Sequence, residues 1–146
     1  MGIELDLSKK ILAPPSVVWS LLGSIQSWPR WWRDCEAARV KDGRAPREGS
    51  ELELVIKPGA TSGNYHPTID LYTEDRVLGM TYRGAFSQST CEWYLNRKPD
   101  GTEVRAKLVY DGVGSLFIRL TGRTTLVRLA LENQLKDLKK FAERMT

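Results

Sequence analysis

The C-terminal stretch of this chain constrains its fold more than any other feature. Its apolar side chains recur at spacings of four and three residues, which places them on one face of an α-helix: Leu131, Leu135, Leu138, Ala142 and Met145. Charged side chains cover much of the opposite face, and neither proline nor glycine interrupts the sequence from Thr124 onward. We therefore expect a long amphipathic helix that begins as early as Ser115, with Gly122 as its weakest point.

The residues before this helix instead alternate between apolar and polar side chains, which is typical of strands with one buried face. The expected strands cover residues 3–11, 37–41, 51–57, 65–73, 76–83, 88–97 and 102–110. Short turns such as Lys98-Pro99-Asp100-Gly101 separate several of them, so strands that are neighbours in sequence should pair antiparallel. Only the final helix is long enough to cover the buried face of such a sheet. The sequence thus predicts an α+β helix-grip fold, a curved antiparallel sheet of about six to seven strands around a long C-terminal helix.

Two short helices are expected directly after the first strand. Pro14 and Pro15 end the strand because proline cannot donate to a ladder, and Pro15 suits the first turn of a helix. Apolar side chains at helical spacing then run to Gly23. A second short helix is expected over residues 25–31, with Ser24 as its N-cap.

Composition indicates one globular domain over residues 1–146. Hydrophobic residues make up 41% and charged residues 27% of the 146 positions, and a chain of this length needs no disulfide or metal to fold. The net charge of +4 comes from basic residues spread along the chain, so no nucleic-acid partner is expected. No apolar run approaches the roughly 20 residues that span a bilayer, so no stable membrane insertion is expected either.

The cysteines and the single histidine suggest no metal centre. Cys35 and Cys91 lack CxxC spacing, and His66 is the only histidine, so the usual zinc ligands are too few. No nucleotide or other cofactor motif is present, and we expect no cofactor. Because the N-terminus does not resemble a signal or transit peptide, we expect a cytoplasmic protein with reduced thiols.

No catalytic constellation is visible, and the catalytic residues remain unassigned. In the expected strand 65–73, His66, Asp70 and Tyr72 share one face, whereas Ile69 and Leu71 share the other. Either face could point inward; we favour Ile69 and Leu71, which leaves His66 in solvent near the strand end. Cys91 has no visible base partner and is expected to be a buried apolar group rather than a nucleophile.

Several segments together resemble the START-like (SRPBCC) superfamily, and in particular its polyketide cyclase/dehydrase-like branch. The resemblance rests on Ile11-Leu12-Ala13-Pro14-Pro15-Ser16-Val17-Val18-Trp19, followed by Trp28-Pro29-Arg30-Trp31-Trp32. Glu92-Trp93-Tyr94-Leu95 and the turn at Asp100-Gly101 resemble the penultimate hairpin of the family, and residues 135–143 resemble its final helix. The resemblance covers essentially the whole chain and implies a helix-grip fold. It does not fix the activity, because the superfamily includes lipid carriers, hormone receptors, cyclases and co-chaperone domains.

We expect the domain to bind or transport a small hydrophobic ligand, such as a lipid, an isoprenoid or an aromatic polyketide, in a cavity between sheet and helix. One alternative is a polyketide cyclase or aromatase that uses cavity tyrosines or His66. A second alternative is a protein-binding adaptor with an exposed apolar patch at residues 28–32. The expected cavity lining consists of Trp31, Leu54, Ile56, Ile69, Leu71, Cys91, Trp93, Ala106, Leu108, Val127 and Leu131.

Overall fold

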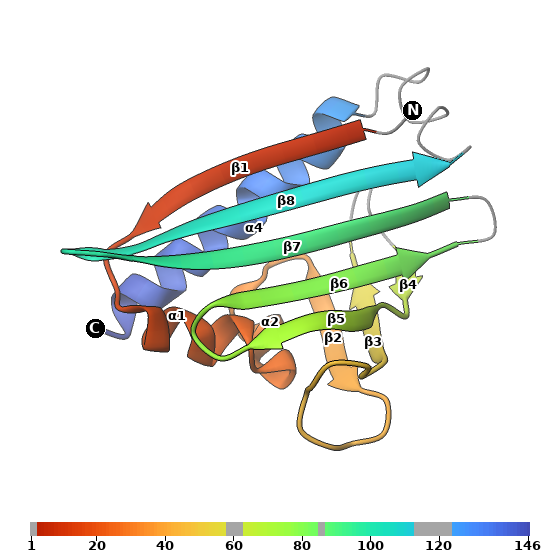
Figure 1. The fold of residues 1–146 in the computed structure, drawn as a ribbon, viewed down its shortest axis with the longest axis horizontal. Helices are drawn as coiled ribbons and strands as arrows, with labels where there is room; N and C mark the ends of the chain where they lie inside the picture. Colours follow the sequence, from red (N-terminus) through yellow and green to blue (C-terminus); the bar gives the residue numbers. More distant parts are fainter. Residues whose placement is uncertain (1–2, 58–62, 85–86, 113–123) are drawn as a thin grey trace.

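The computed structural model of the protein describes residues 3–57, 63–84, 87–112 and 124–146 (Figure 1). The elements in chain order are β1 (Ile3–Ile11), α1 (Pro15–Leu22), the 3₁₀ turn η1 (Ile25–Ser27), α2 (Trp28–Trp31), β2 (Cys35–Val40), β3 (Leu52–Ile56), β4 (Gly63–Tyr65), β5 (Thr68–Thr73), β6 (Val77–Arg83), β7 (Ser87–Lys98), β8 (Gly101–Gly112) and α4 (Thr124–Arg144). This arrangement confirms the predicted α+β helix-grip architecture. The suggested helix start at Ser115 falls outside the described residues.

A five-stranded antiparallel sheet in the order β1-β8-β7-β6-β5 forms the larger layer. β7 and β8 are joined by the predicted tight turn, since Lys98 pairs with Gly101. β1 pairs with β8 along its whole length, from Ile3 opposite Tyr110 to Ile11 opposite Thr102. The first strand of the sequence is therefore closed onto the last, which brings the start of the chain beside the strand that precedes α4.

A separate three-stranded sheet in the order β2-β3-β4 replaces part of the single sheet that the sequence predicts. The expected strand 65–73 is two strands in different sheets, β4 and β5, and the break falls at His66-Pro67. Proline cannot donate to a ladder; the Pro67 carbonyl instead accepts a hydrogen bond from the Leu52 N–H at 2.9 Å. This contact keeps the two sheets adjacent while the chain passes from one to the other.

A β-bulge in β5 changes which side chains of that strand face inward. The register with β6 shifts between Ile69, which pairs with buried Met80, and Leu71, which pairs with Gly79. Because Met80 and Gly79 point to opposite faces, Ile69 faces the core and Leu71 does not. The expectation that both face inward is correct for Ile69 and wrong for Leu71.

Tyr72 occupies the inner face beyond this bulge. Its hydroxyl donates to the Gly23 carbonyl at 2.8 Å, and its ring meets the Trp19 ring edge-on with centroids 5.1 Å apart. The end of α1 is thereby held against β5, which closes one end of the space under the sheet.

The two short helices pack through their tryptophans. The Trp28 Nε1–H donates to the Leu22 carbonyl at 3.0 Å, and the Trp31 Nε1–H donates to the Leu21 carbonyl at 3.1 Å. Both tryptophans are buried. Their indole N–H groups therefore satisfy carbonyls at the C-terminal end of α1, where a helix lacks internal partners.

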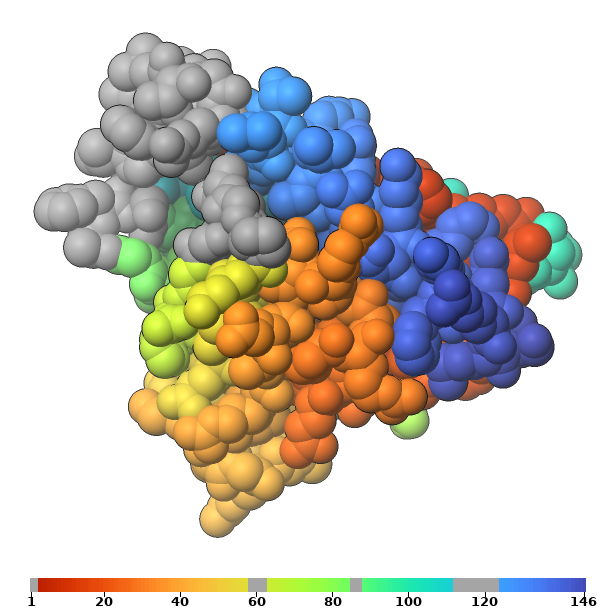
Figure 2. All heavy atoms as spheres, turned by 180° about the vertical axis from the view of Figure 1, so that it is seen from behind, coloured from red at the N-terminus to blue at the C-terminus, as the bar shows by residue number. Residues whose placement is uncertain are grey.

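Helix α4 crosses the inner face of the large sheet and lies behind β1, β8 and β7 in Figure 1. Its buried side chains are Val127, Leu131, Leu135, Leu138 and Ala142. The last four belong to the stripe that the sequence predicts, whose remaining member, Met145, is exposed. Seen from behind in Figure 2, the blue atoms of α4 lie beside the orange atoms of α2 and β2. The guanidinium and backbone N–H of Arg33 both donate to the Asp137 carboxylate, which ties this segment to the helix.

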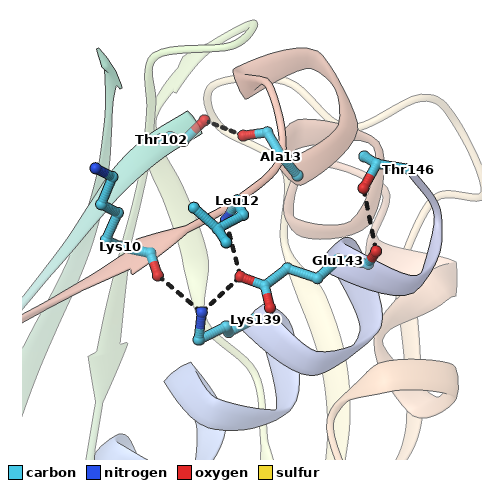
Figure 3. Close-up of polar contacts among 7 residues, drawn as sticks. All are labelled: Lys10, Leu12, Ala13, Thr102, Lys139, Glu143 and Thr146. Atoms are coloured by element: carbon cyan, nitrogen blue, oxygen red, sulfur yellow. Dashed lines mark hydrogen bonds and ion pairs between the residues drawn. The ribbon is translucent and has the colours of Figure 1, made fainter. Parts of the chain in front are cut away.

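The C-terminal end of α4 is fixed to the link between β1 and α1 by polar contacts (Figure 3). The Glu143 carboxylate accepts hydrogen bonds from the Leu12 N–H at 2.8 Å and from the Lys139 ammonium at 2.5 Å. Lys139 also donates to the Lys10 carbonyl at 3.2 Å. Beside them, the buried Thr102 hydroxyl donates to the Ala13 carbonyl at 2.7 Å. Within the described residues, no helix is long and apolar enough to cross a bilayer.

Candidate ligand-binding cavity

A cavity of about 560 Å³ lies between the N-terminal half of α4, the inner face of the large sheet and the β2-β3-β4 sheet. It is lined by Trp32, Asp34, Ile56, Asn64, Tyr65, His66, Tyr82, Arg83, Gly84, Ser89, Cys91, Leu108, Tyr110, Val127, Ala130, Leu131 and Gln134. Its volume falls within the range of roughly 300–1,000 Å³ that is typical of small-molecule sites.

The strand register arranges the sheet side of the cavity in successive cross-strand rows. One row contains Tyr82, Ser89 and Tyr110, which are directly paired across β6, β7 and β8. The next row, two residues further along each strand, contains Met80, Cys91 and Leu108. Two residues of a strand span about 6.8 Å. The sheet wall therefore changes from hydroxyl-bearing to apolar side chains within that distance.

A third row closes the apolar end of the cavity. It contains Leu78, Trp93 and Ala106, paired across the same three strands, and all three are buried in the core. Neither Trp93 nor Ala106 contributes to the lining. The large Trp93 indole thus fills the space beneath the sheet, and the cavity ends at the row of Cys91.

Three tyrosines gather at the other end of the cavity. The rings of Tyr65 and Tyr82 meet edge-on, with centroids 5.7 Å apart and planes at 89°. Burial raises the pKa of Tyr110 to about 12 and raises that of Tyr65. Burial, with smaller contributions from Cys91 and Tyr110, raises the pKa of Tyr82 well above the usual range. All three phenols are therefore protonated at neutral pH and can donate hydrogen bonds.

The two cysteines are buried thiols without nucleophilic character. Burial raises the pKa of Cys91 to about 12 and that of Cys35 to about 11. A thiol is nucleophilic only as the thiolate, so both are unreactive at neutral pH. Cys91 is buried and borders the cavity, where it contributes a small apolar surface.

Exposed polar residues mark the rim of the cavity. Asn64, His66, Arg83 and Gly84 are exposed, and Asp34 is half-buried. Arg83 and Gly84 lie at the end of β6, Asn64 and His66 lie at the junction of β4 and β5, and Asp34 directly precedes β2. His66 is thus at the rim, consistent with its predicted position in solvent. The described residues contain no cluster of three or more His, Cys, Asp or Glu side chains that could hold a metal ion.

Five of the eleven residues that we expected in the lining border the cavity: Ile56, Cys91, Leu108, Val127 and Leu131. Ile69, Trp93 and Ala106 face the same interior but lie in packed core. Leu54 belongs to buried core and also borders a groove on the outer side of the small sheet. Leu71 lies on the outer face because of the β5 bulge.

The tryptophan at the cavity is Trp32 rather than Trp31. Trp31 is buried against α1 through its hydrogen bond to Leu21. Trp32 follows α2, is half-buried, and stacks on Trp31 with centroids 6.4 Å apart. The sequence places these neighbours on different sides of the chain but does not show which side faces α4.

Tyr65, Tyr82, Ser89, Tyr110, Ala130 and Gln134 also line the cavity, and the expected set omits them. Tyr110 alternates with Leu108 and Ala106 along one strand, so strand periodicity could have identified it. Ala130 and Gln134 lie one turn apart on α4 and flank Leu131. Neither residue belongs to the stripe of large apolar side chains from which we derived the buried face of the helix, although both line the cavity beside Val127 and Leu131.

The sequence matches a family model described as "Polyketide cyclase / dehydrase and lipid transport" over residues 2–143. The chain belongs to this family. No curated protein matches the sequence.

Solved structures support the family assignment at the level of the fold. A START superfamily protein from Mycobacterium smegmatis has a TM-score of 0.72 at 18% identity, covering 98% of this chain and 99% of its own. A protein from Thermus thermophilus has a TM-score of 0.79 at 16% identity, covering 99% of each chain. The di-domain ARO/CYC StfQ from the steffimycin biosynthetic pathway has a TM-score of 0.72 at 18% identity, covering 97% of this chain and 45% of its own. The protein therefore has a START-like fold.

Proposed function

We propose that the protein binds a small hydrophobic ligand, of the lipid or aromatic polyketide class, in the cavity between α4 and the sheets. The observation that supports this most directly is the cavity itself, whose inner wall is formed by Ile56, Cys91, Leu108, Val127 and Leu131. Apolar walls with a few polar groups are typical of small-molecule sites. The family description, which includes lipid transport, agrees with this proposal.

The first test is native mass spectrometry of the purified protein, followed by denaturation and identification of any released compound. In parallel, an environment-sensitive naphthalene fluorophore is titrated into the protein. We expect one molecule bound per chain. A protein that is empty and binds no apolar probe would contradict the proposal.

A cavity-filling variant localises the binding site. Ala130→Trp places an indole in the cavity and should weaken probe binding at least about tenfold, which corresponds to 1.4 kcal/mol. Leu129→Trp is the matched control, because Leu129 is the adjacent residue of α4, is 47% exposed and does not line the cavity. Equal binding by both variants would place the probe elsewhere.

A cyclase or aromatase is the second candidate function. It is supported by the cluster of Tyr65, Tyr82 and Tyr110 in one cavity with His66 at the rim, and by the structural similarity to the di-domain ARO/CYC StfQ. Protonated phenols can supply protons but cannot serve as bases at neutral pH. Incubation with a linear poly-β-ketone mimic, followed by product analysis, tests for turnover. A turnover that Tyr82→Phe abolishes while binding persists would favour the enzyme.

The adaptor function has less structural support than the other two. It requires an exposed apolar patch at residues 28–32, yet Trp28 and Trp31 are buried and Trp32 is half-buried. These side chains are used in packing the short helices and the cavity wall.

A further inference from the structure

The cavity has a polarity gradient that runs along the strands of its sheet wall. Its inner end, at the level of Cys91 and Leu108, presents thiol and hydrocarbon surface. Its outer end, about 6.8 Å away along the strands, presents the Tyr82, Ser89 and Tyr110 side chains. A ligand with one apolar and one polar end therefore has a preferred direction of entry.

The described lining contains two oppositely charged side chains, Asp34 and Arg83, and neither is fully buried. Arg83 is exposed and Asp34 is half-buried, and they carry opposite charges. His66 is also exposed. A carboxylate at the level of Tyr82 would lose much of its hydration, and the described part of the lining holds no buried cation to compensate it, so its burial is costly. A neutral acceptor at the same level would lose far less.

The hydroxyls of the outer row can donate hydrogen bonds to an acceptor on the ligand. The raised pKa values of Tyr82 and Tyr110 keep both phenols protonated at neutral pH. A phenol O–H is a good donor to a carbonyl oxygen. Ser89, paired between the two tyrosines, is buried at the same level.

We propose, building on the ligand-binding function above, that the cavity selects neutral ligands with an apolar body and a hydrogen-bond acceptor such as a ketone at one end. The apolar body lies at Cys91 and Leu108. The acceptor lies at Tyr82 and Tyr110, which are the residues that determine head-group specificity.

Three naphthalene probes that differ only in the head group test this selectivity. They are 6-propionyl-2-dimethylaminonaphthalene, its 6-propyl analogue and its 6-carboxylate analogue, titrated at pH 7.5 by fluorescence. A net hydrogen bond contributes about 0.5–1.5 kcal/mol, so the ketone should bind about 2- to 13-fold more tightly than the propyl probe. The carboxylate should bind at least about tenfold more weakly than the ketone.

Variants that remove single hydroxyls assign the effect to the tyrosines. Tyr82→Phe and Tyr110→Phe should each weaken ketone binding by about 2- to 10-fold and leave propyl binding unchanged. Tyr94→Phe is the matched control, because the Tyr94 hydroxyl donates to Glu92 and does not line the cavity. It should alter binding of neither probe.

The outcomes separate this proposal from the broader one. Binding of none of the three probes would contradict the ligand-binding function itself. If the propyl probe binds, the ligand-binding function is retained. If the carboxylate probe then binds as tightly as the ketone probe or more tightly, the head-group selectivity is overturned. A ketone preference that survives in the Tyr82→Phe/Tyr110→Phe double variant would overturn the assignment to these residues.

Discussion

At the scale of single residues, Thr102 joins the start of β8 to the link between β1 and α1. Its side chain is fully buried and its hydroxyl donates to the Ala13 carbonyl at 2.7 Å. Thr102→Val preserves shape but leaves that carbonyl without its partner, which costs about 1–3 kcal/mol. We expect urea unfolding to show this loss. Thr73→Val, at the exposed end of β5, should change stability by less than about 0.5 kcal/mol; equal effects would mean that the buried hydrogen bond is unimportant.

The buried thiols predict a loss of stability in alkaline solution. Burial raises the pKa of Cys35 to about 11 and that of Cys91 to about 12, from 9.0. At a pH between the unfolded pKa of 9.0 and these raised values, the folded state binds more protons than the unfolded state. The free energy of unfolding therefore falls as pH rises above 9. Urea titrations from pH 7.5 to 10.5 should show a decline that is shallower in Cys91→Ala. An identical slope in both proteins would contradict the role of Cys91.

At the scale of elements, the two ends of α4 differ in how they are held. Glu132 and Glu143 each pair with a basic residue one turn earlier, Arg128 and Lys139. Glu143 additionally accepts the Leu12 N–H, and this hydrogen bond, followed by the one from Lys139, lowers its pKa. Glu143→Ala should therefore cost about 1–2 kcal/mol at pH 7, whereas Glu132→Ala should cost at most about 0.5 kcal/mol.

The lowered pKa of Glu143 gives this comparison a pH dependence. The carboxylate stabilises the folded state above its unfolded pKa of about 4.5, and the contribution is lost as pH falls through the lowered folded value. The difference between the Glu143→Ala and Glu132→Ala proteins should shrink below pH 4. A difference that persists at pH 3 would point to packing rather than charge.

Sequence periodicity predicts a helix or strand well where its apolar residues recur at a constant spacing. It fails where a single residue ends a strand or reverses which side chains of the strand face the core. The 3.6-residue stripe identifies α4, and alternation identifies β1, β7 and β8. The division of residues 65–73 depends on Pro67, and the reversal of Leu71 depends on a one-residue bulge. A bulge reverses the alternation of inward-facing and outward-facing side chains along a strand, and the residue types of the strand do not reveal it. The cavity was therefore predicted in its location, between sheet and helix, but only partly in its residues.

At the scale of the whole molecule, the space beneath the large sheet is packed at one end and open at the other. The packed end contains Trp93 against the sheet, the buried Leu138 and Ala142 of α4, and the Glu143 contacts of Figure 3. The open end contains the cavity, bordered by Val127 and Ala130. The same helix thus serves as a fixed support over its last turns and as a cavity wall over its first turns.

This division predicts how hydrogen exchange along α4 responds to a ligand. Local opening is easiest where buried apolar contacts are few, so amides of residues 124–131 should exchange faster than those of residues 138–144 in the free protein. A bound ligand adds contacts to Val127, Ala130 and Leu131 and should slow exchange at these residues. It should also slow exchange near Ser89 and its partner Tyr110, at the end of the β7–β8 hairpin opposite its turn. The last turns, already packed, should change little. Mass spectrometry of peptides with and without the naphthyl ketone measures both regions, and protection confined to residues 138–144 would place the ligand outside the cavity.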